Sequence, residues 1–404
     1  MDIENPALRI SRKIADAALA GAREDKLLDT FCGLLVKDGV PLARAVLGAD
    51  TLHPVLEGRV FEWNASASSV RQAEYGRSAS AEEDTRWTRS PFHALAEKNS
   101  GLLRRRLTGP DAELDFPILE EVAARGMTDY VAMLTRFGEH AAIGGLDSIY
   151  SSWATDRAEG FDDTHVAMLE LLMPMLASAV KGASLRRIAE TIAETYLGFD
   201  AGRRVLRGTI RRGTAERIEA ALWFSDLRGF TRLVDAEAPD RVIPLLNDYA
   251  DAVVTAIHEG GGQVLKFMGD GVLAIFVGAD VAEGCERALG AARVALARSG
   301  EVSARRATEG LGTTEAYLGL HVGAVYYGNI GSADRLDFTV IGPAVNEVSR
   351  IAGMCKSLER PVVASQAFAA SFHTPARALV SLGRYALRGI ERPQELFTLD
   401  PDAT

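Results

Sequence analysis

The stretch Gln263–Phe276, with the sequence QVLKFMGDGVLAIF, decides the fold of the second half of this chain. Two apolar runs, Val264–Met268 and Val272–Phe276, flank a GDG tripeptide at positions 269–271. Asp-Gly between two β-prone runs is a strong hairpin signal, because a primed turn needs positive φ angles that glycine adopts freely. Such a hairpin would hold the carboxylate of Asp270 on a rigid ribbon, as a metal-binding carboxylate requires. Taken alone, the tripeptide is also ordinary turn chemistry.

Composition sets the outer limits of the interpretation. The chain has 404 residues, 47% of them hydrophobic and 25% charged, which is typical of a soluble protein with two or three domains. Its net charge of −10 argues against nucleic acid or an anionic membrane as the main partner. Two basic clusters, Arg104–Arg106 and the arginines between positions 203 and 212, are interpreted as solvated helix or linker faces.

The cysteines and the N-terminal sequence bear on the compartment. The three cysteines are scattered and form no CxxC pair, which excludes a disulfide framework and a thiolate zinc site. No run of about 18 apolar residues exists, and the N-terminal MDIENPALRISRK contains no secretory hydrophobic segment. We therefore expect a cytoplasmic protein that neither enters a membrane nor binds nucleic acid.

Residues 1–160 and 161–214 read as two different kinds of region. The first mixes a helix near 27–35 with strands near 60–63, 130–137 and 149–154, and Ser78–Asp84 reads as an exposed loop. The second begins with a long helix, whose apolar residues alternate three and four apart. That spacing suits either a seam between paired helices or a helix packed on its own domain. Pro174 is expected to kink or divide this helix, and a polar connector follows it.

Residues 215–400 alternate strands and helices, which predicts an α/β or α+β sandwich. Asp226 stands at the end of an apolar strand, just before the helix start at Gly229, Phe230 and Thr231. The expected elements are a strand Ala220–Ser225, a helix from Val242 closed by Gly260–Gly262, the opening hairpin, a helix Cys285–Ala297, strands Ala316–Tyr327 and Leu336–Ile341, a helix Ala344–Leu358, and a hairpin of Tyr385–Leu387 with Glu395–Leu399.

Asp226 and Asp270 are the candidate metal ligands. The connection between them returns the second strand beside the first, so both carboxylates are expected at one sheet edge. Two aspartates without histidine or thiolate suit two magnesium or manganese ions, which would serve phosphoryl displacement. The amides of Gly229, Phe230 and Thr231 would face the anionic phosphates. Each aspartate alone would read as a helix cap or turn residue.

Four strings, FSDLRGFT, GGQVLKFMGDGVLAIF, YGNIGS and DFTVIGPAVNEVSR, resemble the catalytic domain of class III nucleotidyl cyclases in order and spacing. The resemblance covers 215–400 and implies a ferredoxin-like α+β sandwich. It implies that Asp226, Asp270 and the backbone carbonyl of Leu227 bind the two metal ions. It also implies that Lys266 and Thr339 read the purine. Family members that make cyclic AMP carry lysine with threonine, serine or aspartate here, whereas guanylate cyclases carry glutamate and cysteine.

The same resemblance gives Asn346 and Arg350 the roles of orienting the ribose and stabilising the charged transition state. Their spacing of four places them on one helix face. Lys266 is unusual, because lysine within a buried-type strand needs a partner. Ile390 stands near where some relatives carry a triphosphate-binding lysine, which leaves that role to Arg388 or Arg392 or unassigned. Pro343 and Glu347 are less usual choices around this helix.

The resemblance implies an active site shared between two chains. The metal aspartates come from one protomer, and the purine pair with Asn346 and Arg350 from the other, so activity requires a homodimer. The implied reaction is attack of the ribose 3′-OH of ATP on the α-phosphate, giving cyclic AMP and pyrophosphate. The alternatives are a non-catalytic nucleotide-binding module, which the full set of functional residues opposes, and a guanylate cyclase, which Lys266 and Thr339 oppose.

The stretch SIYSSWATDRAEGFDDTHVAMLELLMPMLASAV resembles the closing strand and exit helix of GAF-type sensor domains. The resemblance implies a GAF-like sensor in 1–160 with an unidentified small-molecule ligand. A PAS-like domain and a plain dimerisation domain without ligand stay open. Trp63, Trp87, Trp153 and His93 are candidates for a pocket or for simple core. The region 161–214 would then transmit the state of the sensor to the catalytic domain by changing how two chains pair.

Overall fold

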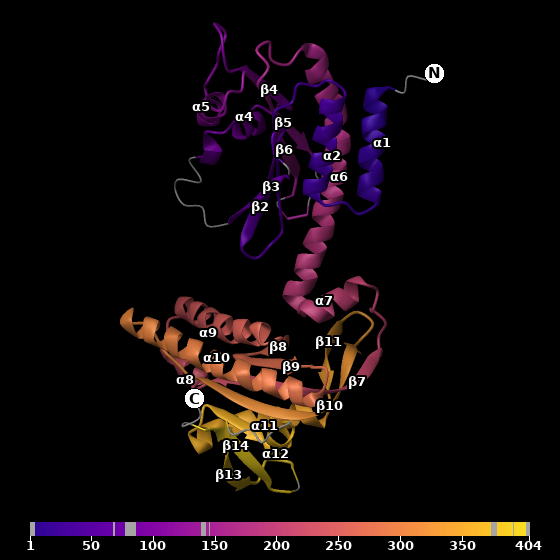
Figure 1. Cartoon of the computed structure of the whole chain (residues 1–404). Coiled ribbons are helices and arrows are strands. Elements are labelled where there is room, and N and C mark those ends of the chain that lie inside the picture. Colours follow the sequence, from indigo (N-terminus) through magenta and orange to yellow (C-terminus); the bar gives the residue numbers. More distant parts are fainter. Residues whose placement is uncertain are drawn as a thin grey trace. The chain divides into compact units, whose positions relative to one another are not determined.

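The computed structural model describes residues 5–67, 69–76, 86–138, 143–144, 146–372, 378–390 and 392–400. The chain divides into two compact units, Met1–Ile192 and Ala193–Thr404 (Figure 1). The division falls inside the stretch 161–214 that the sequence predicts as a connector. The predicted loop Ser78–Asp84 lies outside the described residues.

The first unit is built on a six-stranded antiparallel sheet in the order β3-β2-β1-β6-β5-β4. Helices α1, α2 and α6 pack on one face, and α4 and α5 pack on the other (Figure 1). The elements are α1 Pro6–Leu19, α2 Glu24–Lys37, β1 Arg44–Asp50, β2 Leu56–Asn64, β3 Arg71–Gly76, α4 Pro91–Glu97, β4 Leu102–Arg106, α5 Pro117–Ala124, β5 Asp129–Arg136, β6 Ser148–Thr155 and α6 Asp163–Leu197. The helix and the three strands expected here from the sequence coincide with α2, β2, β5 and β6, although residue 137 of the expected strand 130–137 lies beyond the end of β5. The GAF-like assignment itself stays a prediction.

Helix α6 continues through Pro174 as one element of 35 residues, so the expected division is wrong. Met173 and Leu176, on either side of Pro174, are buried in the core of the first unit. Their packing stabilises the helix at the point where the proline has no N–H to donate. The first half of α6 therefore packs on its own domain, one of the two readings of its spacing. By length and composition α6 would also be able to span a membrane, with a mean hydropathy of 1.5 over a window that is 44% buried here. A core helix of a soluble protein passes the same test, so the expectation of no membrane stays a prediction.

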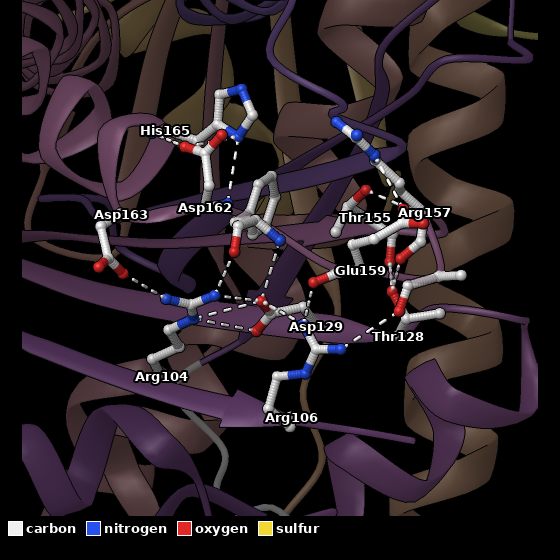
Figure 2. Close-up of polar contacts among 12 residues, drawn as sticks. Arg104, Arg106, Thr128, Asp129, Thr155, Arg157, Glu159, Asp162, Asp163 and His165 are labelled. Carbon is white, nitrogen blue, oxygen red and sulfur yellow. Dashed lines mark hydrogen bonds and ion pairs between the residues drawn. The ribbon is translucent and has the colours of Figure 1, made fainter. Parts of the chain in front are cut away.

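The arginines of β4 correct one sequence interpretation. Arg104 and Arg106 surround the carboxylate of Asp129, which is fully buried on β5 (Figure 2). Arg104 lies 2.7 Å from Asp129 and also donates to the carbonyl of Phe161, whose own N–H donates to Asp129 over 3.0 Å. Arg105 pairs with Asp115. The cluster is therefore an ion-pair network and not a solvated face. The prediction was wrong because the sequence did not reveal Asp129 as the buried partner of these arginines.

The second unit contains an eight-stranded mixed sheet in the order β13-β14-β12-β10-β7-β9-β8, with β11 paired to β10. Only the β10–β12 pair is parallel among the described strands. Helices α9 and α10 cover one face, and α7 and α11 pack on the other. The elements are α7 Phe199–Leu206, β7 Ala215–Leu227, α8 Phe230–Ala236, α9 Pro239–Glu259, β8 Gln263–Met268, β9 Gly271–Phe276, α10 Val281–Thr308, β10 Ala316–Gly331, β11 Leu336–Ile341, α11 Pro343–Leu358, β12 Val362–Ser365, α12 Gln366–Ala370, β13 Leu379–Tyr385 and β14 Gln394–Leu399.

The mixed α/β content predicted for this unit is confirmed, and one strand was misplaced. The last hairpin pairs β13, Leu379–Tyr385, with β14, whereas the sequence predicted Tyr385–Leu387 as its first strand. Leu387 lies outside the sheet and is buried against Ile351 and Cys355 of α11. Its apolar side chain therefore serves the core beneath α11 and not the strand pattern.

Candidate active site

The β8–β9 hairpin forms as the sequence predicts, although a different glycine makes its turn. Met268 pairs with Gly271, which leaves Gly269 and Asp270 as the two loop residues. Gly269 has φ 68°, while Gly271 is not in the positive-φ region. Glycine at the first central position is the pattern of a II′ turn. Gly271 is required for another reason, because a Cβ there would lie 3.0 Å from the ring of Phe224 and 3.1 Å from the carbonyl of Ser225.

Asp226 and Asp270 meet at this turn. The amide of Leu227 donates to Oδ2 of Asp270 over 3.2 Å, which fixes the tip of the hairpin to the end of β7. Burial, the hydrogen bond that protonated Asp226 donates to the carboxylate of Asp270, and the charge of Asp270 raise the pKa of Asp226 to about 7. Two carboxylates in contact with no cation between them repel each other, and protonation of one relieves that repulsion.

A cavity of about 260 Å³ opens beside the two aspartates. Its lining residues come from the end of β7, from α9 and from the β8–β9 hairpin: Ser225, Asp226, Leu227, Leu246, Asn247, Tyr249, Ala250, Val253, Phe267, Gly269, Asp270, Val272 and Ala316. The described residues contain no cluster of three or more His, Cys, Asp or Glu side chains that would hold a metal by themselves. The donor set is thus two carboxylates plus backbone oxygen, which leaves most coordination positions of a hard cation to substrate and water.

This donor set fits a divalent cation of the magnesium or manganese type. Oxygen ligands suit both ions, and the carboxylates of Asp226 and Asp270 carry a charge that no described arginine or lysine neutralises. The backbone carbonyl of Leu227 stays the predicted additional ligand. The residues predicted to bind phosphate follow directly. Gly229 takes φ 67° at the start of α8 and provides no side-chain cap, and Phe230 and Thr231 form its first turn.

Lys266 and Thr339, the predicted purine pair, lie on β8 and β11. Lys266 is not inside a buried strand, because β8 is the edge of the sheet and its lysine side chain is 38% exposed. Its ammonium lies 3.5 Å from the carboxylate of Asp337. Thr339, two residues further on β11 and so on the same face, is buried, and its hydroxyl has no hydrogen-bond partner among the described residues. A buried hydroxyl without a partner is free to bond a polar ligand.

Asn346 and Arg350 lie one turn apart on α11, the first exposed and the second half-buried. Within the described part of the chain, the guanidinium of Arg350 has one recorded hydrogen bond, to the carbonyl of Gly389 at 3.5 Å. The sequence predicts that Val345, Val348, Ala352 and Cys355 face the core; the last three are buried, and Val345 is half-buried. Gly389 directly follows Arg388, so Arg388, one candidate for the terminal phosphates, is next in sequence to a residue that Arg350 contacts.

One chain does not gather all of these residues around one cavity. The cavity beside Asp226 and Asp270 is lined by none of the purine or α11 residues. Asp226 is paired with Tyr317 near the start of β10, whereas Thr339 is paired with Gly328 near its end. On β8, the side chain of Phe267 lines the cavity, and its neighbour Lys266 projects from the opposite face of the strand.

Comparison with known proteins assigns this part of the chain to a family. Residues 214–400 match the family model described as "Adenylate and Guanylate cyclase catalytic domain". The second unit therefore contains a cyclase catalytic domain. The match covers less than half of the chain, and the first unit lies outside it.

Curated relatives of the cyclase domain include proteins named adenylate cyclase. The chain is 33% identical over 147 residues to "Adenylate cyclase" of Anabaena cylindrica, covering 36% of this chain and 29% of the relative. It is 34% identical over 160 residues to "Adenylate cyclase 1" of Rhizobium meliloti, covering 39% and 24%. An uncharacterized protein of Mycobacterium tuberculosis is 33% identical over 220 residues, covering 54% and 39%. The chain thus spans two fifths or less of the length of these relatives.

Solved structures similar to the cyclase domain carry both cyclase names. The adenylyl cyclase CyaB from P. aeruginosa is 23% identical, with a TM-score of 0.44, over 47% of this chain and 97% of that one. The guanylyl cyclase Cya2 is 25% identical, with a TM-score of 0.41, over 46% and 93%. At these TM-scores neither structure bears on the activity of the chain.

Sequence reasoning did not identify Asp337 as a neighbour of the predicted purine pair. The sequence did contain a signal for Asp337, because this residue precedes Thr339 by two positions on a predicted strand and therefore lies on the same face of that strand. What the sequence did not reveal is that β11, which is paired only with β10, comes within reach of Lys266 on β8.

Proposed function

We propose that this chain is an adenylate cyclase that converts ATP to 3′,5′-cyclic AMP and pyrophosphate. The observation that carries the proposal is the contact between Asp226 and Asp270 beside an open cavity, inside a domain of the cyclase family. A carboxylate pair without a cation is costly to maintain, so its presence supports a site that receives divalent metal with the substrate.

Each residue of the chain has a distinct task in this proposal. Two divalent ions, when bound, would activate the ribose hydroxyl and neutralise the phosphates. Asp226, Asp270 and the carbonyl of Leu227 would hold them, and the first-turn amides of α8 would meet phosphate oxygens. Arg350 would stabilise the charge that develops on the phosphate, and Asn346 would orient the ribose.

The choice of ATP over GTP depends on Lys266 and Thr339. Lysine donates hydrogen bonds only, which suits N1 of adenine, an acceptor. The Thr339 hydroxyl has no partner among the described residues and can accept from the N6 amine. On guanine the corresponding ring position carries a hydrogen and the exocyclic atom is a carbonyl, so the same lysine would face a donor. The nearby carboxylate of Asp337 adds a second acceptor for an amine.

The active form in this proposal is a homodimer with two equivalent shared sites. Asp226 and Thr339 of one chain are paired near opposite ends of β10, which supports assembly of each site from two chains. The edge strand β8 leaves Phe267 59% exposed and Met268 49% exposed, and β10 and β11 expose Tyr326 and Ile341. Exposed apolar residues gathered on neighbouring strands are typical of a surface that another chain covers.

Two other functions remain as alternatives. A non-catalytic nucleotide-binding module would need no complete metal pair, and both aspartates are in place here. A guanylate cyclase would need groups that read guanine, which Lys266 and Thr339 do not supply. In either case the first unit would act as a regulatory domain of the GAF-like or PAS-like kind, with a ligand still to be identified. We place the protein in the cytoplasm, without a membrane or nucleic acid partner.

The test is to identify the product. The purified chain is incubated with ATP or GTP and with magnesium or manganese, and nucleotides are separated by chromatography. Cyclic AMP from ATP, reduced at least about a thousandfold by Asp270→Asn, is the expected result. Cyclic GMP as the main product would replace the proposal with the guanylate alternative. No cyclic nucleotide with either metal, and no difference from Asp270→Asn, would rule out an enzyme.

A further inference from the structure

One face of β10 is shaped to receive helix α11. Gly319, His321 and Gly323 alternate along the strand and therefore project to the same side. A Cβ on Gly319 would come within 2.6 Å of the backbone of α11, at the carbonyl of Val348 and the amide of Ala352. Because Gly319 and Gly323 have no side chains, the backbone of α11 can lie close to the sheet. Among these three residues, only His321 places a side chain between β10 and α11.

The ring of His321 is buried and has a defined partner on each side. Its Nδ1 lies 2.8 Å from Oγ of Ser365, which is fully buried and also accepts from the amide of Phe368. Because that oxygen already accepts a hydrogen bond, its own hydrogen is best placed toward Nδ1. The remaining ring hydrogen is then on Nε2, which faces Oε2 of Glu347 at 3.6 Å.

Glu347 connects this histidine to a third element. Its other carboxylate oxygen accepts from the side-chain amide of Gln394 on β14. The helix on which it lies, α11, begins at Pro343 after Gly342 and has no side-chain cap. The first turns of α11 are therefore fixed by tertiary contacts, and Glu347 supplies two of the polar ones.

We propose that Glu347 and His321 are positioning residues for the cyclase reaction, which set how α11 presents Asn346 and Arg350 to the nucleotide. The inference rests on the proposed function, since it assigns those two residues to catalysis. Asn346 precedes Glu347 directly, and Arg350 follows it by three residues on the same helix. A shift of this helix by about 1 Å moves both groups together, and misplacement of that size can cost roughly a hundredfold in rate.

The charge of Glu347 should also be readable in the titration of His321. Burial lowers the pKa of His321, and the carboxylate of Glu347 raises it in part. Among the described residues, Glu347 is the charged group that acts on the pKa of His321. The other recorded partner of the ring is the uncharged Ser365, which ends β12 and caps α12, and β14 contributes the uncharged Gln394 to Glu347. Protonation of the ring would turn Nδ1 into a donor and reverse its bond with Ser365.

The first arm of the test is steady-state kinetics of cyclic nucleotide formation in the full chain. Glu347→Ala should lower kcat roughly tenfold or more and leave KM for ATP within about twofold, because positioning acts on the transition state. Glu347→Gln keeps the side-chain volume and an acceptor for Gln394, so it should recover most of kcat near neutral pH. Glu301→Gln, an exposed glutamate of α10, is the matched control and should behave as wild type.

The second arm follows His321 by NMR, with its resonance identified by its absence in His321→Gln. Removing the anion in Glu347→Gln should lower the pKa of His321 relative to wild type. In Glu347→Gln, the low-pH limb of the kcat profile should move to lower pH by a similar amount. Asp226 contributes equally to that limb in wild type and in the variant, so it does not affect the difference. A glutamate that only supports the fold would still change the pKa of His321 but would leave the low-pH limb of kcat unmoved.

Three outcomes decide the inference. The expected kcat loss together with the paired movement of the His321 pKa and the kcat limb supports it. An active wild type whose kcat and pH profile are unchanged in both Glu347 variants overturns it. If Glu347→Ala does not fold, the isosteric Glu347→Gln still decides, since an unmoved His321 pKa contradicts the contact. Wild-type chain that makes no cyclic nucleotide is a failure of the proposed function, and the NMR arm then tests the contact by itself.

Discussion

Each unit of the chain brings acidic side chains into its sheet, and the two units treat them in opposite ways. In the first unit, Asp129 is fully buried and receives two arginines and a backbone amide. In the second unit, Asp226 has another carboxylate, Asp270, as its neighbour, and its pKa rises to about 7. A buried carboxylate that is ion-paired with arginines stabilises the fold, whereas a carboxylate that lies against another carboxylate is suited to bind a metal cation from solution.

Loss of Asp129 should have the largest effect on stability. Asp129→Asn removes the buried anion that Arg104 and Arg106 share, and breaking such a pair costs about 3 kcal/mol of unfolding free energy. Calorimetry should show the loss in the transition of the first unit. Asp163→Asn is the matched control, since Asp163 also reaches Arg104 but its side chain is fully exposed, and it should change stability by about 0.5 kcal/mol or less. If Asp129→Asn and Asp163→Asn lowered the unfolding free energy equally, the buried carboxylate would not be more important for stability than the exposed one.

Asp226 and Asp270 should respond in the other direction. Without metal, Asp226→Asn or Asp270→Asn should not lower the thermal midpoint, because each relieves repulsion between the carboxylates. Manganese at about a hundred times its Kd should stabilise the wild type by about 2.7 kcal/mol and leave both variants unchanged. The measurement is a thermal melt with and without manganese. Destabilised variants, or variants still stabilised by manganese, would show that the pair is structural.

Asp50 lies between these two extremes, because its partner is the neutral hydroxyl of Tyr75, at 2.7 Å. Burial, more than the charges of Asp147 and Glu57, raises its pKa to about 6. The unfolded chain ionises near the ordinary value of 3.8, so the stability of the first unit should fall as pH rises from about 4 to 6 and level off above. Asp50→Asn should remove this fall, an effect of about 2–3 kcal/mol. Denaturant titrations at several pH values measure it, and an unchanged pH profile in the variant would contradict the assignment.

The pair Lys266–Asp337 should give the smallest effect. Both side chains are substantially exposed, so their attraction contributes no more than about 1 kcal/mol. Asp337→Asn should therefore leave folding unchanged and alter KM for ATP by about fivefold or less, with the ratio of ATP to GTP use as the more sensitive readout. Ser332→Ala, in the β10–β11 turn, is a suitable control. A large loss of stability would mean that Asp337 is structural.

The cyclase domain was largely predictable because its signals are local. The GDG tripeptide and the alternating apolar residues predict the β8–β9 hairpin, and the spacing of Val348, Ala352 and Cys355 predicts the buried face of α11. These patterns depend only on neighbours in the sequence. Even there, the tertiary reason for Gly271, its approach to β7, was not visible in the sequence.

What the sequence did not reveal depends on long-range partners. The position of β8 at the sheet edge makes Lys266 an exposed lysine and not a buried one. Asp129 lies more than twenty residues from the arginines it binds, so the basic run of β4 looked solvated. Glu347 was noticed only as an unusual residue, because the contacts with His321 and Gln394 come from other strands.

The central claim is that one nucleotide site is made by two chains, with the carboxylate pair from one and α11 from the other. The direct measurement mixes Asp226→Asn chain with Arg350→Ala chain, each inactive alone, and assays cyclic AMP. A mixed dimer keeps one intact site of two, so an equal mixture should reach about a quarter of wild-type activity. An inactive mixture, with mixed dimers confirmed by differently tagged chains, would contradict the shared site.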